Sequence, residues 1–312
     1  MSQVSLEKIE FVQKHLRHPD CVRLTNGVVD IVATTQCGPR ILRYGFVKGE
    51  NMLGDASEVN AQTPLGEWRA LGGHRLWAAP EAFARSYSAD NFPLAVEAVS
   101  PLGARFRASA DPAGIEKEIE VSLAPTGSAV TVRHTLTNRT HWRIEVAPWA
   151  LTIMRGLGRT ILPLEPFQSH GECLDPARPL VLWHFTQLDD PRFALGKKYI
   201  TMRSVENMNV ATKIGTGNKQ GWAAYHVDKT LFVKRMPYDD RQRYPDYGCN
   251  TETFTKGAFM ELESLGHLEF LNPGESAHHT ECWYLFDNVN LETGDDAMDA
   301  VLKPLVAMTN YE

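Results

Sequence analysis

The sequence lacks the features that define several large classes of protein. No stretch approaches the roughly 18 consecutive apolar residues that a membrane-spanning helix needs. Residues 1–14 contain no basic region followed by an apolar one, so we expect no secretory signal peptide. An excess of positive charge is missing as well: 32 Lys and Arg stand against 38 Asp and Glu, the net charge is −6 and the pI is about 6.0, which leaves no basic stripe to neutralise phosphates. We therefore predict a cytoplasmic protein with neither a membrane nor a nucleic-acid partner.

Cysteine and histidine are present, but not in spacings that hold disulfides or metals. The cysteines are odd in number and form no CxxC pair, a pattern typical of reduced thiols in a cytosolic protein. The eleven histidines include no HExxH motif, and His278 and His279 should point to opposite faces of a strand. We expect no structural metal and no cofactor, and the oligomeric state is left open. The five cysteines are Cys21, Cys37, Cys173, Cys249 and Cys282.

Linkers and low-complexity segments are also missing. The composition, with 43% hydrophobic and 22% charged residues, is that of an ordinary globular protein and does not change abruptly along the chain. The length of 312 residues would allow two average domains, but all-β sandwiches often run this long as one. We predict a single domain over residues 1–312.

What the chain does contain is a rhythm of short strands. Residues 95–151 hold five alternating runs separated by turn signals, a spacing typical of a sandwich or barrel. In the run 115–123, Ile119 and Val121 belong to a buried face while Glu118 and Glu120 point away. Asn26-Gly27 predicts an earlier two-residue hairpin turn.

The two ends of the chain differ in how clearly their patterns predict secondary structure. Residues 4–17 fit a helix or a strand equally well. Residues 293–305 predict a short C-terminal helix, with Thr293 as a candidate cap and Pro304 stopping or kinking the helix. The proline-rich residues 152–200 predict a long loop excursion over one mouth of the sheets.

The stretch from residue 258 to residue 286 organises the rest of the chain. It reads as strand, connection, strand, Asn-Pro-Gly turn and strand. In the first strand, Glu261 and Glu263 share one face and lie about 7 Å apart, at about 3.4 Å per residue. If both line a cleft, each disfavours ionisation of the other, and at least one pKa should rise into the range useful for acid–base chemistry. The alternative is a solvated strand face.

A second candidate site lies in the run GGHRLWAAPE. After two glycines, which permit close backbone approach to a ligand, it carries a histidine, an arginine, a tryptophan and a glutamate. These side chains offer a proton shuttle, a planar donor fork, a flat face that suits a sugar ring and a carboxylate. The alternative is a glycine turn into a core strand. The four residues are His74, Arg75, Trp77 and Glu81. A further candidate is Arg40, which follows Gly38-Pro39. Its side chain would either reach a site or pair with a surface carboxylate.

Three stretches resemble the aldose 1-epimerase, or galactose mutarotase-like, superfamily. They are CGPRILRYGFVKGENML, IEKEIEVSLAPTGSAVTVRHTLTNRT and MELESLGHLEFLNPGESAHHTECWYLF. The GGHRLWAAPE run is similar to a less characterised branch of that superfamily. The resemblance implies an all-β fold, a galactose mutarotase-like β-supersandwich with a short C-terminal helix, and a small-molecule carbohydrate ligand in a cleft on one face.

The resemblance also implies a mechanism. In the superfamily, a glutamate on the late strand takes the anomeric hydroxyl proton while a histidine protonates the ring oxygen, so that the ring opens and recloses. The glutamate position falls on Glu263, with Glu261 as second choice. The histidine would follow the LTN strand by about ten residues, but there the chain reads APWALT, and Trp149 stands near its place.

Three functions remain open on this basis. The first is an aldose 1-epimerase-like isomerase of a monosaccharide or sugar acid, with Glu263 as base and His74 as a relocated acid. Arg40, Arg75, Trp77, Glu81, Trp149 and Glu261 would bind its substrate. The second is a sugar-binding or regulatory module without catalysis. The third is a glycoside hydrolase or lyase on the same scaffold, with Glu81 and Glu263 as its carboxylate pair.

Overall fold

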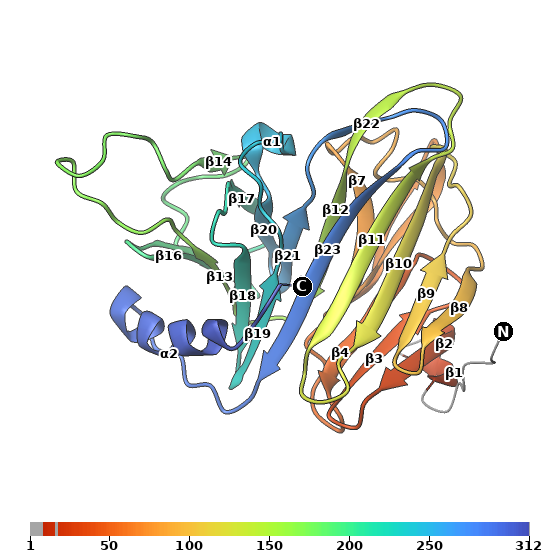
Figure 1. Ribbon diagram of the computed structural model, residues 1–312, viewed down its shortest axis with the longest axis horizontal. Coiled ribbons are helices and arrows are strands. Elements are labelled where there is room, and N and C mark those ends of the chain that lie inside the picture. The colour runs from red at the N-terminus through yellow and green to blue at the C-terminus, as the bar shows by residue number, and fades with distance from the viewer. Residues whose placement is uncertain (1–8, 16–17, 312) are drawn as a thin grey trace.

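The structure, a computed structural model, describes residues 9–15 and 18–311. Nearly all of its regular structure is strand, arranged in two large sheets that pack face to face and one small sheet (Figure 1). This confirms the all-β prediction. Within the described ranges no helix has the length and apolar character needed to cross a membrane. All five cysteines are free thiols.

The first sheet carries the residues of the candidate site. Its strands, in spatial order, are β1 (Ile9–His15), β2 (His18–Thr25), β3 (Val29–Thr34), β4 (Arg40–Phe46), β7 (His74–Ala79), β12 (Ile144–Met154), β21 (Phe259–Leu265), β20 (Thr251–Lys256), β17 (Thr212–Thr216) and β14 (Leu180–Leu182). A short strand, β22 (Glu269–Leu271), also pairs with β12.

The second sheet covers the inner face of the first. Its strands are β15 (Phe193–Leu195), β16 (Tyr199–Arg203), β13 (Arg159–Pro163), β18 (Trp222–Val227), β19 (Thr230–Arg235), β23 (Ser276–Phe286), β11 (Val130–Asn138), β10 (Ile115–Leu123), β9 (Gly103–Arg107) and β8 (Ala95–Ser100). The small sheet pairs β5 (Asp55–Thr63) with β6 (Gly66–Gly72).

The main core lies between the two large sheets. The predicted alternation in β10 is confirmed: Ile119 and Val121 are fully buried in this core, while Glu118 and Glu120 pair with arginines at the surface. Burial of each such aliphatic side chain contributes roughly 1.5–3 kcal/mol. The five strands predicted over residues 95–151 are β8 to β12.

The predicted hairpin and late strands are confirmed as well. Asn26 and Gly27 connect β2 to β3, with Gly27 at a φ of 87° and Asn26 Oδ1 accepting the backbone N–H groups of Val28 and Val29. Residues 258–286 form β21, β22 and β23, with the Asn-Pro-Gly turn between the last two. Of the ambiguous residues 4–17, Ile9–His15 form strand β1 and the others lie outside the described residues.

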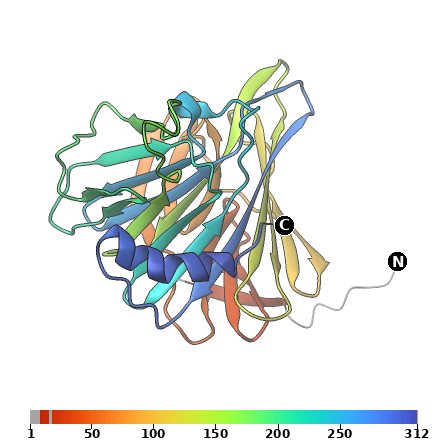
Figure 2. The same cartoon turned by 60° about the vertical axis from the view of Figure 1, so that its left-hand side comes forward.

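The C-terminal helix is present, but its ends differ from the prediction. Helix α2 (Asp295–Ala307) begins after Gly294 without a capping side chain, so Thr293 is not its cap. It also continues through Pro304 to Ala307, because a proline near the last turn removes only one hydrogen bond. Met298 and Leu302 are buried in a cluster with Trp222 and Leu231 of the second sheet. The helix itself lies against that sheet (Figure 2).

Candidate functional site

Period-two alternation gives the central strands of the first sheet two different faces. On β7, Leu76 turns inward to the core, whereas Arg75 and Trp77 turn to the outer face, away from the second sheet. On β21, Leu262 turns inward and Glu263 outward. The antiparallel register of β7, β12 and β21 brings their outward side chains together. We call these residues the outer-face cluster: Arg75, Trp77, Trp149, Lys213, Glu252, Glu261 and Glu263.

An aromatic wall forms one end of the outer-face cluster. The ring of Trp77 lies 5.3 Å from that of Trp149, 5.7 Å from that of Trp68 and 4.9 Å from that of Tyr87. The guanidinium of Arg75 stands 4.3 Å from the centre of the Trp77 ring. Stacked between ring and cation, Trp77 is 97% covered, so it belongs to the wall rather than to an open surface.

Glu263 lies at the bottom of the cluster. One carboxylate oxygen, Oε2, accepts the indole N–H of Trp149 at 2.8 Å and the ammonium of Lys213 at 3.0 Å. The other oxygen, Oε1, has no hydrogen-bond partner among the described residues. The side chain is fully buried, which rules out the solvated strand face considered above.

Lys213 neutralises two carboxylates. Its ammonium lies 2.7 Å from Glu252 and 3.0 Å from Glu263, and it stands over the rings of Trp149 and Trp183 at 4.6 and 4.7 Å. Burial lowers the pKa of Lys213, but the two carboxylates raise it further, to above its usual value. Burial also raises the pKa of Glu252 far above its usual range, against the attraction of Lys213. Lys213 is therefore a fixed positive charge at neutral pH, not a proton donor.

Glu261 is the least buried carboxyl group of the cluster. Its side chain keeps 9% of its exposure, whereas that of Glu263 keeps none. Burial, followed by the charge of Glu263, raises the pKa of Glu261 to about 7, against the pull of Arg75 at 3.3 Å. A group with this pKa is present in both protonation states near neutral pH, which suits acid–base catalysis. The raised pKa was expected for one of the two glutamates.

Arg75 adds donors at the same place. Its Nη2 faces Glu261, while its Nε and Nη1 are buried and have no hydrogen-bond partner in the described part of the chain. Buried guanidinium donors are rarely left unpaired, because each costs about 1–3 kcal/mol. Packing within the described residues therefore leaves these two donors unsatisfied.

Three of the predicted site residues do not join this cluster. His74, proposed as a relocated acid beside Glu263, faces the second sheet and bonds His134 there, so it does not lie on the face that carries Glu263. Arg40 lies beside Arg75 in the sheet, but its guanidinium is fully buried and paired with Asp90 at 2.6 Å, which is a structural ion pair. Glu81 is exposed and accepts the hydroxyl of Tyr87 at 2.6 Å, which places it at the rim of the aromatic wall.

His74 belongs to a polar network between the sheets. Its Nε2 and that of His134 are 2.7 Å apart, and its Nδ1 meets Thr152 Oγ1 at 2.9 Å. Burial lowers the pKa of both histidines, so both rings are neutral. His134 Nδ1 faces the backbone carbonyl of His279 and must carry a hydrogen, so His74 Nε2–H donates to His134 Nε2. Lys234 completes the network with bonds to Thr152 and Glu281.

One possible ligand atom from each of His74, His134 and Glu281 lies within 4.8 Å of the others, which is close enough to hold a metal ion. The fit is poor for two reasons. The two imidazole nitrogens already bond each other, and the Glu281 carboxylate is held by Lys234, Ser264 and Trp283. A metal would also stand beside the buried ammonium of Lys234. We assign this group to the packing of the sheets.

Sequence reasoning missed Lys213 and Glu252 as site residues. Their only sequence signal is alternation: Lys213 in β17 and Glu252 in β20 occupy outward positions of strands that otherwise read as core. Nothing in the sequence shows that β20 and β17 follow β21 in the sheet.

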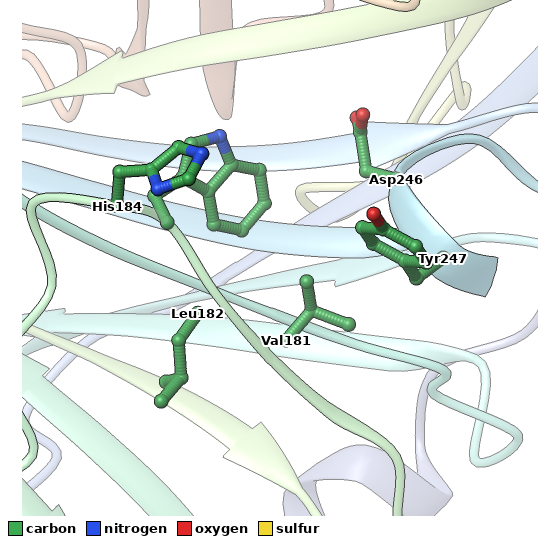
Figure 3. Close-up of a pocket in the computed structure, with 6 residues that line it drawn as sticks. Val181, Leu182, His184, Asp246 and Tyr247 are labelled. Atoms are coloured by element: carbon green, nitrogen blue, oxygen red, sulfur yellow. The ribbon is translucent and has the colours of Figure 1, made fainter.

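A cavity of about 420 Å³ opens at the other end of the cluster from the aromatic wall. One side is formed by residues 181–184, and the other by helix α1 (Pro245–Gly248). Figure 3 shows His184 on one side facing Asp246 and Tyr247 on the other. The lining residues are Val181, Leu182, Trp183, His184, Asp246 and Tyr247.

Two large facing β-sheets, one of which carries an aromatic and carboxylate cluster on its outer face, define a β-sandwich. No family model and no curated protein matches the chain. Solved structures do match it. YeaD from Salmonella typhimurium, provisionally named a mutarotase, has a TM-score of 0.57 and 11% identity over 89% of this chain and 97% of its own. A Klebsiella pneumoniae protein, provisionally named an aldose 1-epimerase, has a TM-score of 0.51 and 12% identity over 96% of this chain and 86% of its own.

A third match agrees with these two. A galactose mutarotase related enzyme from Lactobacillus acidophilus has a TM-score of 0.50 and 8% identity over 86% of this chain and 98% of its own. The chain therefore has the galactose mutarotase-like fold.

Proposed function

We propose that the protein binds a reducing sugar on the outer face of the first sheet and interconverts its anomers through Glu261. The observation that carries the proposal is the pKa of about 7 at a partly accessible carboxyl group, beside the unpaired donors of Arg75 and the Trp77 wall. Aromatic faces and planar donor groups are the side chains that recognise sugar rings and hydroxyls. The fold, shared with proteins named as mutarotases, supports the same ligand class.

One protonated carboxyl group can carry both proton transfers. It holds a donor on one oxygen and an acceptor on the other. Glu261 would give its proton to the ring oxygen as the bond between that oxygen and the anomeric carbon breaks, and its second oxygen would take the proton of the anomeric hydroxyl. The open-chain aldehyde then recloses on either face by the reverse transfers. Glu263, expected as the base, acts here as the buried charge that raises the pKa of Glu261.

The pH dependence follows from the protonated form being active. The rate of anomer exchange should be highest below pH 7 and fall as the pH rises through about 7. Glu263→Gln removes a charge that raises the pKa of Glu261, so the fall should move to lower pH. Glu261→Gln should abolish the exchange and keep the fold.

The measurement is the anomeric-proton exchange rate by NMR on a panel of reducing monosaccharides and uronic acids. An exchange rate in Glu261→Gln equal to that of the wild type would overturn the role of Glu261. Complete loss in Glu263→Gln, with sugar binding intact, would instead make Glu263 the base and Glu261 the acid.

A sugar-binding module without catalysis is the second candidate. The position of His74 on the inner face favours it, because the outer-face cluster then has no imidazole acid. That function predicts saturable binding, seen as a change in tryptophan fluorescence, together with exchange at the spontaneous rate. The hydrolase or lyase function finds less support, since Glu81 is exposed and bonded to Tyr87 while Glu263 is buried.

A further inference from the structure

We propose that the cavity between residues 181–184 and α1 is a second sugar subsite, so that the ligand is a reducing oligosaccharide rather than a free monosaccharide. The inference rests on the proposed function: the reducing unit would lie beside Glu261, and the next unit would lie in the cavity. The subsite would be built mainly by Trp183 and Tyr247, with Asp246 and His184 as polar partners.

The cavity adjoins the outer-face cluster on both of its sides. Trp183 lines the cavity and also places its ring 4.7 Å from the ammonium of Lys213. It lies close to the sheet because residue 215 is glycine: a Cβ there would come within 3.2 Å of Trp183 Cη2. On the opposite side, the charge of Asp246 is close enough to Glu252 to contribute to its raised pKa. Two lining residues of the cavity, Trp183 and Asp246, therefore lie within contact or electrostatic reach of the Lys213–Glu252 pair.

Tyr247 has the exposure and backbone expected of a ligand platform. It is 95% exposed, although it belongs to a wall of the cavity. Both Asp246 and Tyr247 have left-handed backbone conformations, with φ of 49° and 60°. Such conformations are unfavourable for non-glycine residues and gather at functional sites. Because Tyr247 is 95% exposed, its ring is open to stack on a ligand in the cavity.

The outer-face cluster leads toward the cavity. From Arg75 on β7 to Lys213 on β17 the sheet runs through β12, β21 and β20. The side chains lean together across these strands, since the Trp149 ring lies 4.6 Å from the Lys213 ammonium and 5.3 Å from the Trp77 ring. A sugar unit beside Glu261 and a second unit in the cavity would therefore be neighbours along the row.

Binding of matched sugars tests the subsite. The probes are glucose and galactose, each compared with the disaccharides maltose, cellobiose and lactose, titrated by calorimetry against the full chain. At least one disaccharide should bind about tenfold more tightly than its monosaccharide, as expected for one added stacking contact. Tyr247→Ala should lower the affinity for that disaccharide about tenfold. Tyr247→Phe should keep the affinity because the ring remains. Phe92→Ala, a change at an aromatic side chain that is 52% exposed and does not line the cavity, is the matched control and should have no effect.

The outcomes separate this inference from the proposed function. One outcome overturns the subsite alone. In it, anomer exchange of monosaccharides depends on Glu261, but either no disaccharide binds more tightly than its monosaccharide or Tyr247→Ala keeps that difference in affinity. A disaccharide preference that depends on Tyr247, without any exchange above the spontaneous rate, supports the subsite and overturns the isomerase. Absence of binding by every sugar of the panel overturns both.

Discussion

The indole N–H of Trp149 donates to Glu263 at 2.8 Å across two neighbouring strands. In the register of β12 and β21, Leu151 stands opposite Glu263, so the indole reaches the carboxylate along the diagonal of the same face. Lys213 contacts the same oxygen from β17. Glu263 is thus fixed by a neutral donor and a cation from two other strands, and its charge acts on Glu261 from a rigid position.

Replacing Trp149 by phenylalanine tests this relationship. The change keeps an aromatic ring and removes the donor, so the carboxylate of Glu263 loses a bond to a charged acceptor in the interior. The free energy of unfolding should fall by about 2 kcal/mol, the usual range for such bonds being roughly 1.5–3 kcal/mol. Urea denaturation measures it. Trp142→Phe, at a side chain that is 66% exposed, is the control, and equal losses in both variants would contradict the assigned role of the bond.

The raised pKa of Glu261 makes stability depend on pH. A carboxyl group whose pKa is about 7 in the folded state and 4.5 otherwise stabilises the fold when protonated, and this contribution is lost as the pH rises from 4.5 to about 7. The shift corresponds to about 3 kcal/mol at most. Glu261→Gln cannot ionise. Its stability relative to the wild type should therefore be higher at pH 8 than at pH 5.

Urea titrations of both proteins at the two pH values give this difference. Glu206→Gln, at an exposed position, serves as the control for a general charge effect. If the difference in the free energy of unfolding between the wild type and Glu261→Gln does not change with pH, Glu261 ionises normally.

Much of the fold could be predicted because its strands alternate cleanly. The core face of β10 around Ile119, the turn at Asn26 and the shared face of Glu261 and Glu263 all follow from period two or turn chemistry. The same rule explains the error at His74. His74 and Arg75 are adjacent, so only one of them can face the site, and the sequence does not show which face of β7 is covered by the second sheet.

Other parts of the site depend on distant pairings. Lys213 meets Glu263 only because β17 and β20 follow β21 in the sheet, and strand order is not visible in the alternation of any one strand. The burial of Arg40 likewise depends on Asp90, fifty residues away. The long excursion after β13 places Trp183 over Lys213, but proline content alone predicted only a loop.

His74→Asn separates a structural role from a catalytic one. The smaller amide cannot span the distance between Thr152 and His134, so buried polar groups lose partners and the free energy of unfolding should fall by about 1–3 kcal/mol. Sugar affinity per folded molecule should stay unchanged. His141→Asn, at an exposed position, is the control. Lost binding with normal stability would return His74 to the site.

A double-mutant cycle on Lys213 and Glu263 tests the charge arrangement that the proposed chemistry needs. Lys213→Met leaves the Glu263 carboxylate buried without its cation, beside the carboxyl group of Glu252, whose raised pKa favours its neutral form. Breaking such a pair by removing one partner costs about 3–5 kcal/mol, most of it from the uncompensated charge. Adding Glu263→Gln removes this buried charge, so the double variant should be more stable than Lys213→Met alone. Urea denaturation of the wild type, both single variants and the double variant measures the coupling. Additive effects would show that Lys213 does not stabilise the Glu263 carboxylate, and the buried charge invoked to raise the pKa of Glu261 would then lack its support.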